Sequence, residues 1–225
     1  MHHFPKHNMR IELFTGAGGS YFYLPLPQYS ILNDLDNDVA NLYLVVQNQP
    51  EQLHAKIEEL PITEGLMKYW FTHQEADSLM KAVRFLFISN FTYLGKGNTL
   101  KIGLDNTKDL ILGRIQPTFS ALQNSVITCQ DFREVLPKVS FSNTSKNKAF
   151  VYLDPVYLGT EHYYKVPKWT ESDTEDCFKI MDNCGIKCAM SEFTHEAVLD
   201  FASDYKMNVH KLKTRTNLKG KATEI

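Results

Sequence analysis

Long apolar runs are missing from this sequence of 225 residues, and no stretch approaches the ~20 apolar residues that a membrane-spanning helix needs. The first residues, Met1 to Lys6, also lack the basic-then-apolar order of a secretory signal peptide. Hydrophobic residues nevertheless make up 43% of the chain, enough to form a buried core. We therefore expect a cytoplasmic protein with one large domain, or one domain with a small insertion.

Cysteine is scarce, with four residues at positions 129, 177, 184 and 188. Cys184 and Cys188 stand four residues apart, as metal ligands can, but zinc sites usually combine two close pairs and the chain has no second pair. Reduced, buried thiols explain these cysteines better. We expect neither a disulfide framework nor a metal site.

An excess of charge of one sign is also absent, because 24 Lys and Arg face 26 Asp and Glu, a net charge of −2. The distribution is less even than the total. Residues 210–221 contain no acid and five basic side chains: Lys211, Lys213, Arg215, Lys219 and Lys221. Such a strip fits either the electrostatic footprint of nucleic acid or an ordinary solvated edge.

What the chain does contain begins with a nucleotide-binding pattern. Residues 9–14 are expected to form a strand that runs into a glycine turn at 15–20, and a second strand at 29–34 ends on Asp34. Asp34 follows Gly19 by about 15 residues, where an acid can accept two hydrogen bonds from ribose hydroxyls. Either feature alone has a plain explanation, as an ordinary turn or as a helix cap. Together they favour a cofactor that contains a nucleoside.

Strands alternate with helical segments along the rest of the chain. Helices are expected at 36–47, 51–60, 74–90, 107–123 (kinked or ended by Pro117), 171–183 and 196–205, and further strands at 125–129, 149–153, 185–190 and 207–212. Between two of the helices, residues 91–98 predict a mobile loop that mixes aromatic, basic and glycine residues. That mixture suits contact with nucleic acid and is also common in plain surface loops. The alternation favours an α/β fold with a mostly parallel sheet covered on both faces.

The strongest local signal is the turn after the strand at 149–153, where Asp154, Pro155 and Tyr157 follow buried residues. The carboxyl end of such a strand is where ligands bind in an open α/β sheet. A carboxylate, a carbonyl next to proline and a flat ring can hold a planar amine-bearing ring by two hydrogen bonds and a stack. A nicotinamide-dependent oxidoreductase would explain the glycine turn alone and would leave this turn unexplained.

These motifs, in this order, resemble the Dam-type family of adenine-specific DNA methyltransferases, in its phage-like or restriction-modification branch. Residues 12–18 (Glu-Leu-Phe-Thr-Gly-Ala-Gly) resemble that family's Glu-Pro-Phe-x-Gly-x-Gly cofactor loop. Residues 33–43 resemble its Asn-Asp-x-Asn-x-x-Leu-x-Asn-x-Tyr segment, and residues 154–157 resemble its Asp-Pro-Pro-Tyr motif. Residues 91–97, 158–160 and 191–193 extend the likeness, which covers nearly the whole chain.

The resemblance implies a Rossmann-like fold with a small, mainly helical target-recognition insertion, and transfer of methyl from S-adenosylmethionine to the 6-amino group of a flipped adenine. Its implied parts are 1–59 (cofactor), 60–118 (target recognition) and 119–225 (catalysis). Its implied site residues are Asp154, Pro155 and Tyr157 for catalysis, and Glu12, Phe14, Gly16, Gly18, Asp34, Leu35, Asp131 and Phe132 for the cofactor. The residues implied for DNA contact are Tyr93, Lys96, Asn98, Lys101, Arg215 and Lys219. The implied partners are double-stranded DNA and a cognate restriction endonuclease, with the enzyme a monomer.

The chain departs from the family pattern in several places. Leu13 and Val156 replace prolines, nothing before Met9 resembles the family's Gly-Lys helix, and residues 219–225 look like the start of a last sheet strand. Valine at 156 relaxes a torsion that proline would fix, at a cost of about 0.4–1 kcal/mol, so we expect a weakened catalytic turn. A truncated or degenerate remnant that binds DNA or cofactor without catalysis is the alternative.

Overall fold

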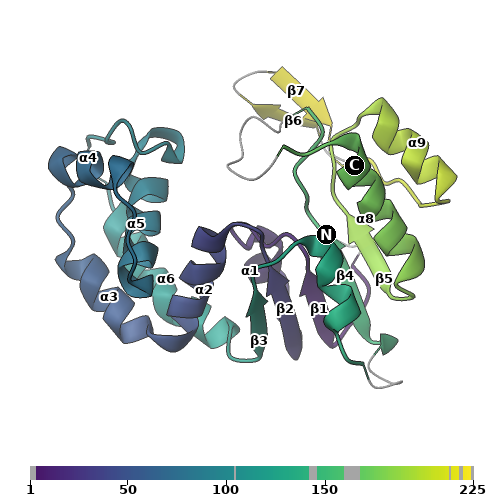
Figure 1. Cartoon of the computed structure of the whole chain (residues 1–225), viewed down its shortest axis with the longest axis horizontal. Coiled ribbons are helices and arrows are strands. Elements are labelled where there is room, and N and C mark those ends of the chain that lie inside the picture. Colours follow the sequence, from purple (N-terminus) through teal and green to yellow (C-terminus); the bar gives the residue numbers. More distant parts are fainter. Residues whose placement is uncertain are drawn as a thin grey trace. The chain divides into compact units, whose positions relative to one another are not determined.

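The computed structural model describes residues 4–103, 105–141, 146–159, 168–212, 214–217 and 220–223 (Figure 1). The chain divides into two compact units. One combines Met1–Asp36 with Thr128–Ile225, and the other is Asn37–Ile127. No helix in the described ranges is both long and apolar enough to cross a membrane.

A five-stranded sheet forms the centre of the first unit, although only the last residue of its strand Ser125–Thr128 is counted in that unit. Its strands are β1 (Met9–Glu12), β2 (Tyr29–Asn33), β3 (Ser125–Thr128), β4 (Ala149–Leu153) and β5 (Lys187–Met190), in the order β3-β2-β1-β4-β5. β1 pairs in parallel with β2 and β4, and β4 pairs in parallel with β5. Central parallel strands are buried on both faces, which is why Ile11, Val151 and Leu153 have no exposed surface. The predicted α/β fold is confirmed.

Helices flank this sheet. They are α1 (Gly19–Tyr23), α8 (Glu171–Asn183) and α9 (Glu196–Asp204), with short 3₁₀ turns η2 (Phe132–Glu134) and η3 (Leu136–Lys138). A capping box between Thr170 and Asp173 starts α8, and Phe178 on its inner face is buried in the core beside the sheet. Figure 1 shows α8 between β5 and α9, which agrees with the contacts of these elements.

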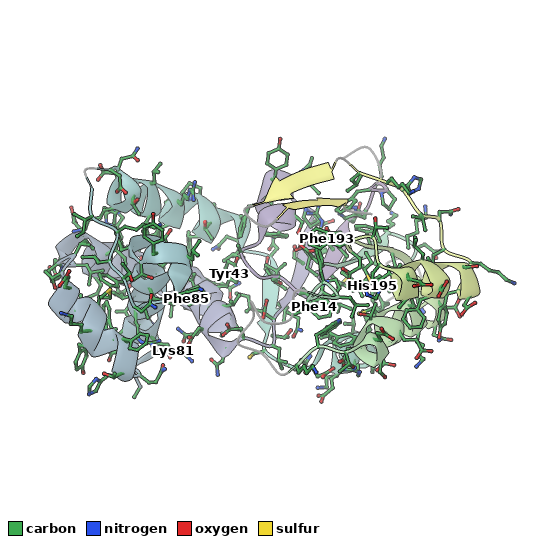
Figure 2. All side chains as sticks on the ribbon, turned by 90° about the horizontal axis from the view of Figure 1, so that it is seen from above. Phe14, Tyr43, Lys81, Phe85, Phe193 and His195 are labelled. Carbon is green, nitrogen blue, oxygen red and sulfur yellow. The ribbon has the colours of Figure 1, made fainter. Side chains whose placement is uncertain are left out.

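The second unit is mainly helical. Its helices are α2 (Asn37–Asn48), α3 (Pro50–Glu59), α4 (Glu64–Thr72), α5 (Ser78–Phe91) and α6 (Thr107–Ala121), with the 3₁₀ turn η1 (Tyr93–Gly95). α2 packs on α5 and α3 packs on α6. Trp70 and Phe87 meet edge to face in its core at 5.2 Å. Lys81 on α5 pairs with Asp38 on α2 at 3.3 Å (Figure 2). The predicted insertion, 60–118, lies inside this unit, and its role stays a prediction.

The helices of this unit differ from the prediction in two places. The helix expected at 74–90 begins at Ser78, because Asp77 accepts a hydrogen bond from the amide of Met80 at 2.9 Å and caps the helix there. The preceding α4 was not predicted. Its only inward anchors are Met67 and Trp70, too few to show a helical period in the sequence.

Pro117 does not end its helix, since α6 continues to Ala121. A proline inside a helix removes one backbone hydrogen bond. Ile111 and Ile115 on one side of Pro117 and Leu122 on the other are buried, so packing holds the helix across that position.

The C-terminal strands also differ from expectation. Residues 207–212 form no strand, and β6 (Thr214–Asn217) instead pairs antiparallel with β7 (Gly220–Thr223). The segment expected to begin a last strand of the main sheet is therefore half of a separate two-stranded sheet within the described residues. A strand needs a neighbour with free backbone groups, and β7 supplies one for β6, which begins two residues after the end of the predicted strand.

Candidate active site

The turn after β4 brings the predicted catalytic acid and tyrosine together. Asp154 is exposed, Pro155 is buried and Tyr157 is half-buried. The hydroxyl of Tyr157 donates to Oδ1 of Asp154 at 2.7 Å. The ring of Tyr157 meets Phe193, which follows β5, edge to face at 4.6 Å. Contacts between the residues that follow β4 and those that follow β5 therefore hold the Tyr157 side chain in place.

Ser191, directly after β5, is a second residue on the same carboxylate. Its hydroxyl donates to Oδ1 of Asp154 at 2.7 Å and lies 3.0 Å from the hydroxyl of Tyr152. Since Ser191 has one hydrogen to give, the Tyr152 hydroxyl completes the chain as its donor. Both of these bonds fall on Oδ1, and none of the described residues donates a hydrogen bond to Oδ2 of Asp154. In the sequence, Ser191 stood out only as part of residues 191–193, which extend the family resemblance.

The glycine loop and Asp34 lie in contact. The amide of Gly16 donates to Oδ2 of Asp34 at 2.7 Å, and the amide of Asp36 donates to Oδ1 at 2.8 Å. Gly16 and Gly18 adopt positive φ angles of 49° and 67°, which favour glycine. Burial raises the pKa of Asp34 and outweighs the two amides, which lower it. The Asp34 carboxylate holds the glycine loop through the Gly16 amide. Because the residue is half-buried, part of it stays accessible to a ligand. Leu35, beside it, is exposed.

Asn33 is a site residue that sequence reasoning missed. It is buried, and its Nδ2 donates to the carbonyls of Leu13 and Gln130, both at 3.0 Å. Its Oδ1 accepts from the hydroxyl of Thr128 at 2.8 Å. One amide side chain thereby joins the segments that follow β1, β2 and β3. A polar residue at the end of a buried strand is the signal by which the sequence could have identified Asn33.

Glu12, at the end of β1, has no exposed surface. One oxygen accepts from the hydroxyl of Ser20 at 2.8 Å, and the other lies 3.8 Å from the guanidinium of Arg10. Burial raises the pKa of Glu12 to about 7, with the nearby charge of Asp154 adding to the rise against Ser20 and Arg10. Glu12 faces Tyr152 in register, two residues before Asp154. The segment predicted to bind the cofactor and the turn predicted to be catalytic therefore follow two directly paired strands.

The acid predicted after β3, Asp131, is held by Arg133. Its carboxylate accepts from the backbone amide of Arg133 at 2.9 Å and from the guanidinium at 3.1 Å. The same guanidinium also bonds Asp173 and Asp176 at the start of α8. Phe132 is buried against Phe14, with ring centroids 5.0 Å apart. Arg133 thus fixes the orientation of the predicted adenine acceptor.

Several buried polar atoms of this unit make no hydrogen bond. Within the described part of the chain they include Oε1 of Glu12, Oγ1 of Thr15 and Nδ1 of His195. Figure 2 labels His195 together with Phe14 and Phe193 in this unit. Native chains leave few such atoms unsatisfied, and a bound ligand is one reason for them. The position Cβ would take at Gly16 also opens into free space. These residues fit a ligand with an amine and a nucleoside.

The DNA contacts predicted from the sequence lie mostly in the second unit. Tyr93, Lys96 and Asn98 are exposed on a turn closed by a bridge between Thr92 and Leu100. Because the amide of Tyr93 donates to the carbonyl of Thr99 at 2.8 Å, the turn is more ordered than its composition predicts. The ammonium of Lys101 caps the end of α5 at the Asn90 carbonyl, 2.8 Å away. The structure does not describe the side chain of Arg215, and Lys219 lies outside the described residues.

Comparison with known proteins places this geometry in a family. Residues 1–218 match the D12 class N6 adenine-specific DNA methyltransferase family. The chain belongs to that family. A curated relative, the type II methyltransferase M1.LlaDCHI of Lactococcus lactis subsp. cremoris, is 23% identical over 256 aligned positions, which cover 98% of this chain and 86% of the relative. The reaction class of this methyltransferase is therefore methylation of the exocyclic amine of adenine in DNA.

Removal of the Ser191 hydroxyl tests how the methyltransferase holds its acid. Because Tyr157 still donates to Asp154 in Ser191→Ala, we expect the single-turnover rate of methyl transfer to fall by about tenfold, as one lost bond to a charged group implies. Ser203→Ala, on the exposed side of α9, is the matched control. Equal rates for the two variants would show that Ser191 does not position the carboxylate.

Restoring proline tests the departure at Val156, which is 8% exposed. Since proline would reduce the freedom of the turn by about 0.4–1 kcal/mol, Val156→Pro should raise the single-turnover rate by less than tenfold. The rate is measured with saturating DNA and cofactor. An unchanged rate in a normally folded variant would contradict the expectation of a weakened turn.

Proposed function

We propose that this methyltransferase transfers methyl from S-adenosylmethionine to the 6-amino group of an adenine flipped out of double-stranded DNA. The observation that supports it most is the carboxylate of Asp154, exposed at the end of β4 next to the glycine loop and held on one oxygen by Tyr157 and Ser191. The other oxygen then accepts the adenine amine.

The cofactor would lie along the ends of β1 and β2. Asp34 would accept the ribose hydroxyls beside Gly16 and Gly18, and Glu12 would meet the methionine ammonium with the buried oxygen that accepts no hydrogen bond and lies 3.8 Å from Arg10. Asp131, Phe132, Phe14 and Leu35 take the adenine by an acceptor and apolar surface. When bound, S-adenosylmethionine supplies an electrophilic methyl group on a sulfonium.

The chain's own groups act on the adenine amine. That nitrogen is a poor nucleophile because its lone pair is delocalised into the ring. Asp154 and the carbonyl of Pro155 accept its two hydrogens and favour a pyramidal nitrogen. As the amine nitrogen gains a methyl group, positive charge would develop on it until one of its two hydrogens leaves as a proton to water. Preoriented acceptors stabilise that charge more than they stabilise the ground state.

Tyr157 would provide the surface for the flipped base. The amine of a paired adenine is out of reach in the duplex, so the base must leave the stack. The edge-to-face contact with Phe193 and the bond to Asp154 restrain the Tyr157 ring, so one position serves both the base and the acid. No covalent enzyme nucleophile is required.

We propose that the helical unit recognises the target sequence. Its exposed turn carries Tyr93, Lys96 and Asn98, and Lys101 lies at the end of α5. Arg215 and Lys219 of the basic strip would add phosphate contacts. We further propose that the enzyme acts as a monomer in the cytoplasm of a bacterium, on bacterial or phage DNA, with a cognate restriction endonuclease that cleaves the same unmethylated site.

The function is tested with the full chain, labelled S-adenosylmethionine and unmethylated plasmid DNA. The expected result is incorporation of label that enzymatic digestion recovers as N6-methyladenine, at one recurring sequence. Binding of cofactor or DNA without transfer would instead identify a silent remnant. Label on cytosine would overturn the assignment of the amine.

Loss of one loop cation tests DNA contact. Lys96→Ala should weaken DNA binding at all sequences alike and reduce the slope of log affinity against log salt by about one unit, because a phosphate contact releases one counterion. Lys56→Ala, on α3 in the same unit, is the control. An unchanged salt slope would remove Lys96 from the interface.

A further inference from the structure

Two thiols outside the active site lie in contact. Cys184 caps the end of α8 and Cys188 is the second residue of β5, and their sulfur atoms are 3.3 Å apart. Gly185, with a φ of 63°, makes the sharp turn that returns the chain toward the first sulfur. The sequence showed only the spacing of these residues, which predicted two unrelated buried thiols.

The pair is chemically asymmetric. The hydrogen bond from Cys188 lowers the pKa of Cys184, and the ammonium of Lys146 acts in the same direction. The pKa of Cys188 is raised by that same bond and by burial. Lys146 lies over the turn, since its Nζ is 3.4 Å from where a Cβ on Gly185 would stand. A nucleophilic thiolate beside a second thiol is the arrangement of a dithiol that forms a disulfide.

The surroundings allow a small reagent to reach the pair. Cys184 and Cys188 are partly exposed, and Gly185 and Lys187 between them are exposed. Among the residues that the structure describes, no cluster of three or more His, Cys, Asp or Glu side chains is able to hold a metal ion. The remaining cysteines offer comparison within one molecule, because Cys177 is fully buried on α8 and Cys129 is on the surface.

We propose that Cys184 and Cys188 form a reversible disulfide by exchange with a low-molecular-weight disulfide such as oxidised glutathione. The Cys184 thiolate attacks one sulfur of the reagent, and its partner leaves as a thiolate. The Cys188 thiol then loses its proton and attacks the Cys184 sulfur of the mixed disulfide. The second glutathione thiolate leaves and takes up a proton. The protein gives up two electrons and two protons, and the reagent is reduced to two thiols.

The new bond would close the turn between α8 and β5. Cys188 stands opposite Val151 of β4, three residues before Asp154, so oxidation fixes the start of the strand that ends beside Ser191. The site lies at the opposite end of β5 from the catalytic turn, and the proposal does not depend on the methyl-transfer chemistry.

The experiment treats the folded full chain with oxidised glutathione, blocks remaining thiols by alkylation and digests with trypsin. Because Lys187 lies between the two cysteines, trypsin separates them, and a disulfide is seen as two joined peptides. We expect the joined peptides, loss of two alkylatable thiols, and their return with dithiothreitol. Cys129 should retain a glutathione adduct, and Cys177 should not react before unfolding.

Two variants distinguish exchange from simple exposure. Cys188→Ser should accumulate glutathione on Cys184, since the resolving thiol is gone. Cys184→Ser should leave Cys188 largely unmodified. The proposal is overturned if native protein keeps glutathione on Cys184 without joined peptides, if both thiols stay alkylatable while Cys129 reacts, or if the two variants take up glutathione equally.

Discussion

Replacement of Asp154 by asparagine should lower the single-turnover rate of methyl transfer by about 10²–10³-fold, the usual effect of losing one preoriented group that stabilises developing charge. Asparagine keeps the size of the side chain and one acceptor, but removes the negative charge opposite the nitrogen. Because Asp154 is proposed to contact the adenine rather than the cofactor, the dissociation constant for S-adenosylmethionine should change by less than about threefold. Rates are measured in a quenched single turnover with saturating DNA.

The control for this result is Asp200→Asn on the exposed face of α9, which should retain the native rate. Loss of activity in both variants would point to folding rather than chemistry. If Asp154→Asn stays within about fivefold of native, well inside the loss expected of such a group, the pocket proposed around this carboxylate is wrong.

Replacement of Glu12 by glutamine should stabilise the protein without cofactor and weaken cofactor binding. Burial raises the pKa of Glu12 from 4.5 to about 7, so between these values the folded chain holds a proton that the unfolded chain releases. The free energy of unfolding therefore falls as pH rises from about 4.5 to about 7. Glutamine does not ionise, so the variant avoids this fall in the free energy of unfolding. The native protein should therefore be less stable than the variant by about 3 kcal/mol at pH 8, with no difference from this cause below about pH 4.5. Urea unfolding of both proteins at several pH values measures it.

The binding prediction has the opposite sign. A cofactor ammonium pairs with the ionised form of Glu12, so native affinity should increase as pH rises from about 5.5 to about 7.5 and then level off. In Glu12→Gln the affinity should be roughly 10–100-fold lower at pH 7.5, as loss of one charged hydrogen bond implies, and nearly flat with pH. Stability and ligand binding would then trade against each other at one buried carboxylate.

Glu51→Gln, on the exposed side of α3, is the matched control and should change neither quantity. Parallel pH profiles of unfolding for the native and Glu12→Gln proteins would show that Glu12 is charged at neutral pH in the folded chain. Unchanged affinity would remove Glu12 from the cofactor site without affecting the role of Asp154.

The elements that the sequence predicted well are those whose signals are local. β4 and the turn at Asp154 to Tyr157 follow from a buried run that ends in an acid and a proline, and α8 follows from apolar spacing and a capping box. The helix α4 and the hairpin β6–β7 escaped prediction. Helix α4 buries little, and pairing of β6 depends on a partner rather than on its own residues.

By itself the sequence determined the family and the α/β order, and it predicted the candidate site residues, because motifs and hydrophobic periods involve neighbours along the chain. Only the tertiary structure decided which groups share a hydrogen bond there. Ser191 holds Asp154 across 37 positions, and Asn33 joins the ends of three strands. Parallel strands bring their ends together in space whatever their separation in the chain, so such partners are set by the sheet order rather than by local sequence.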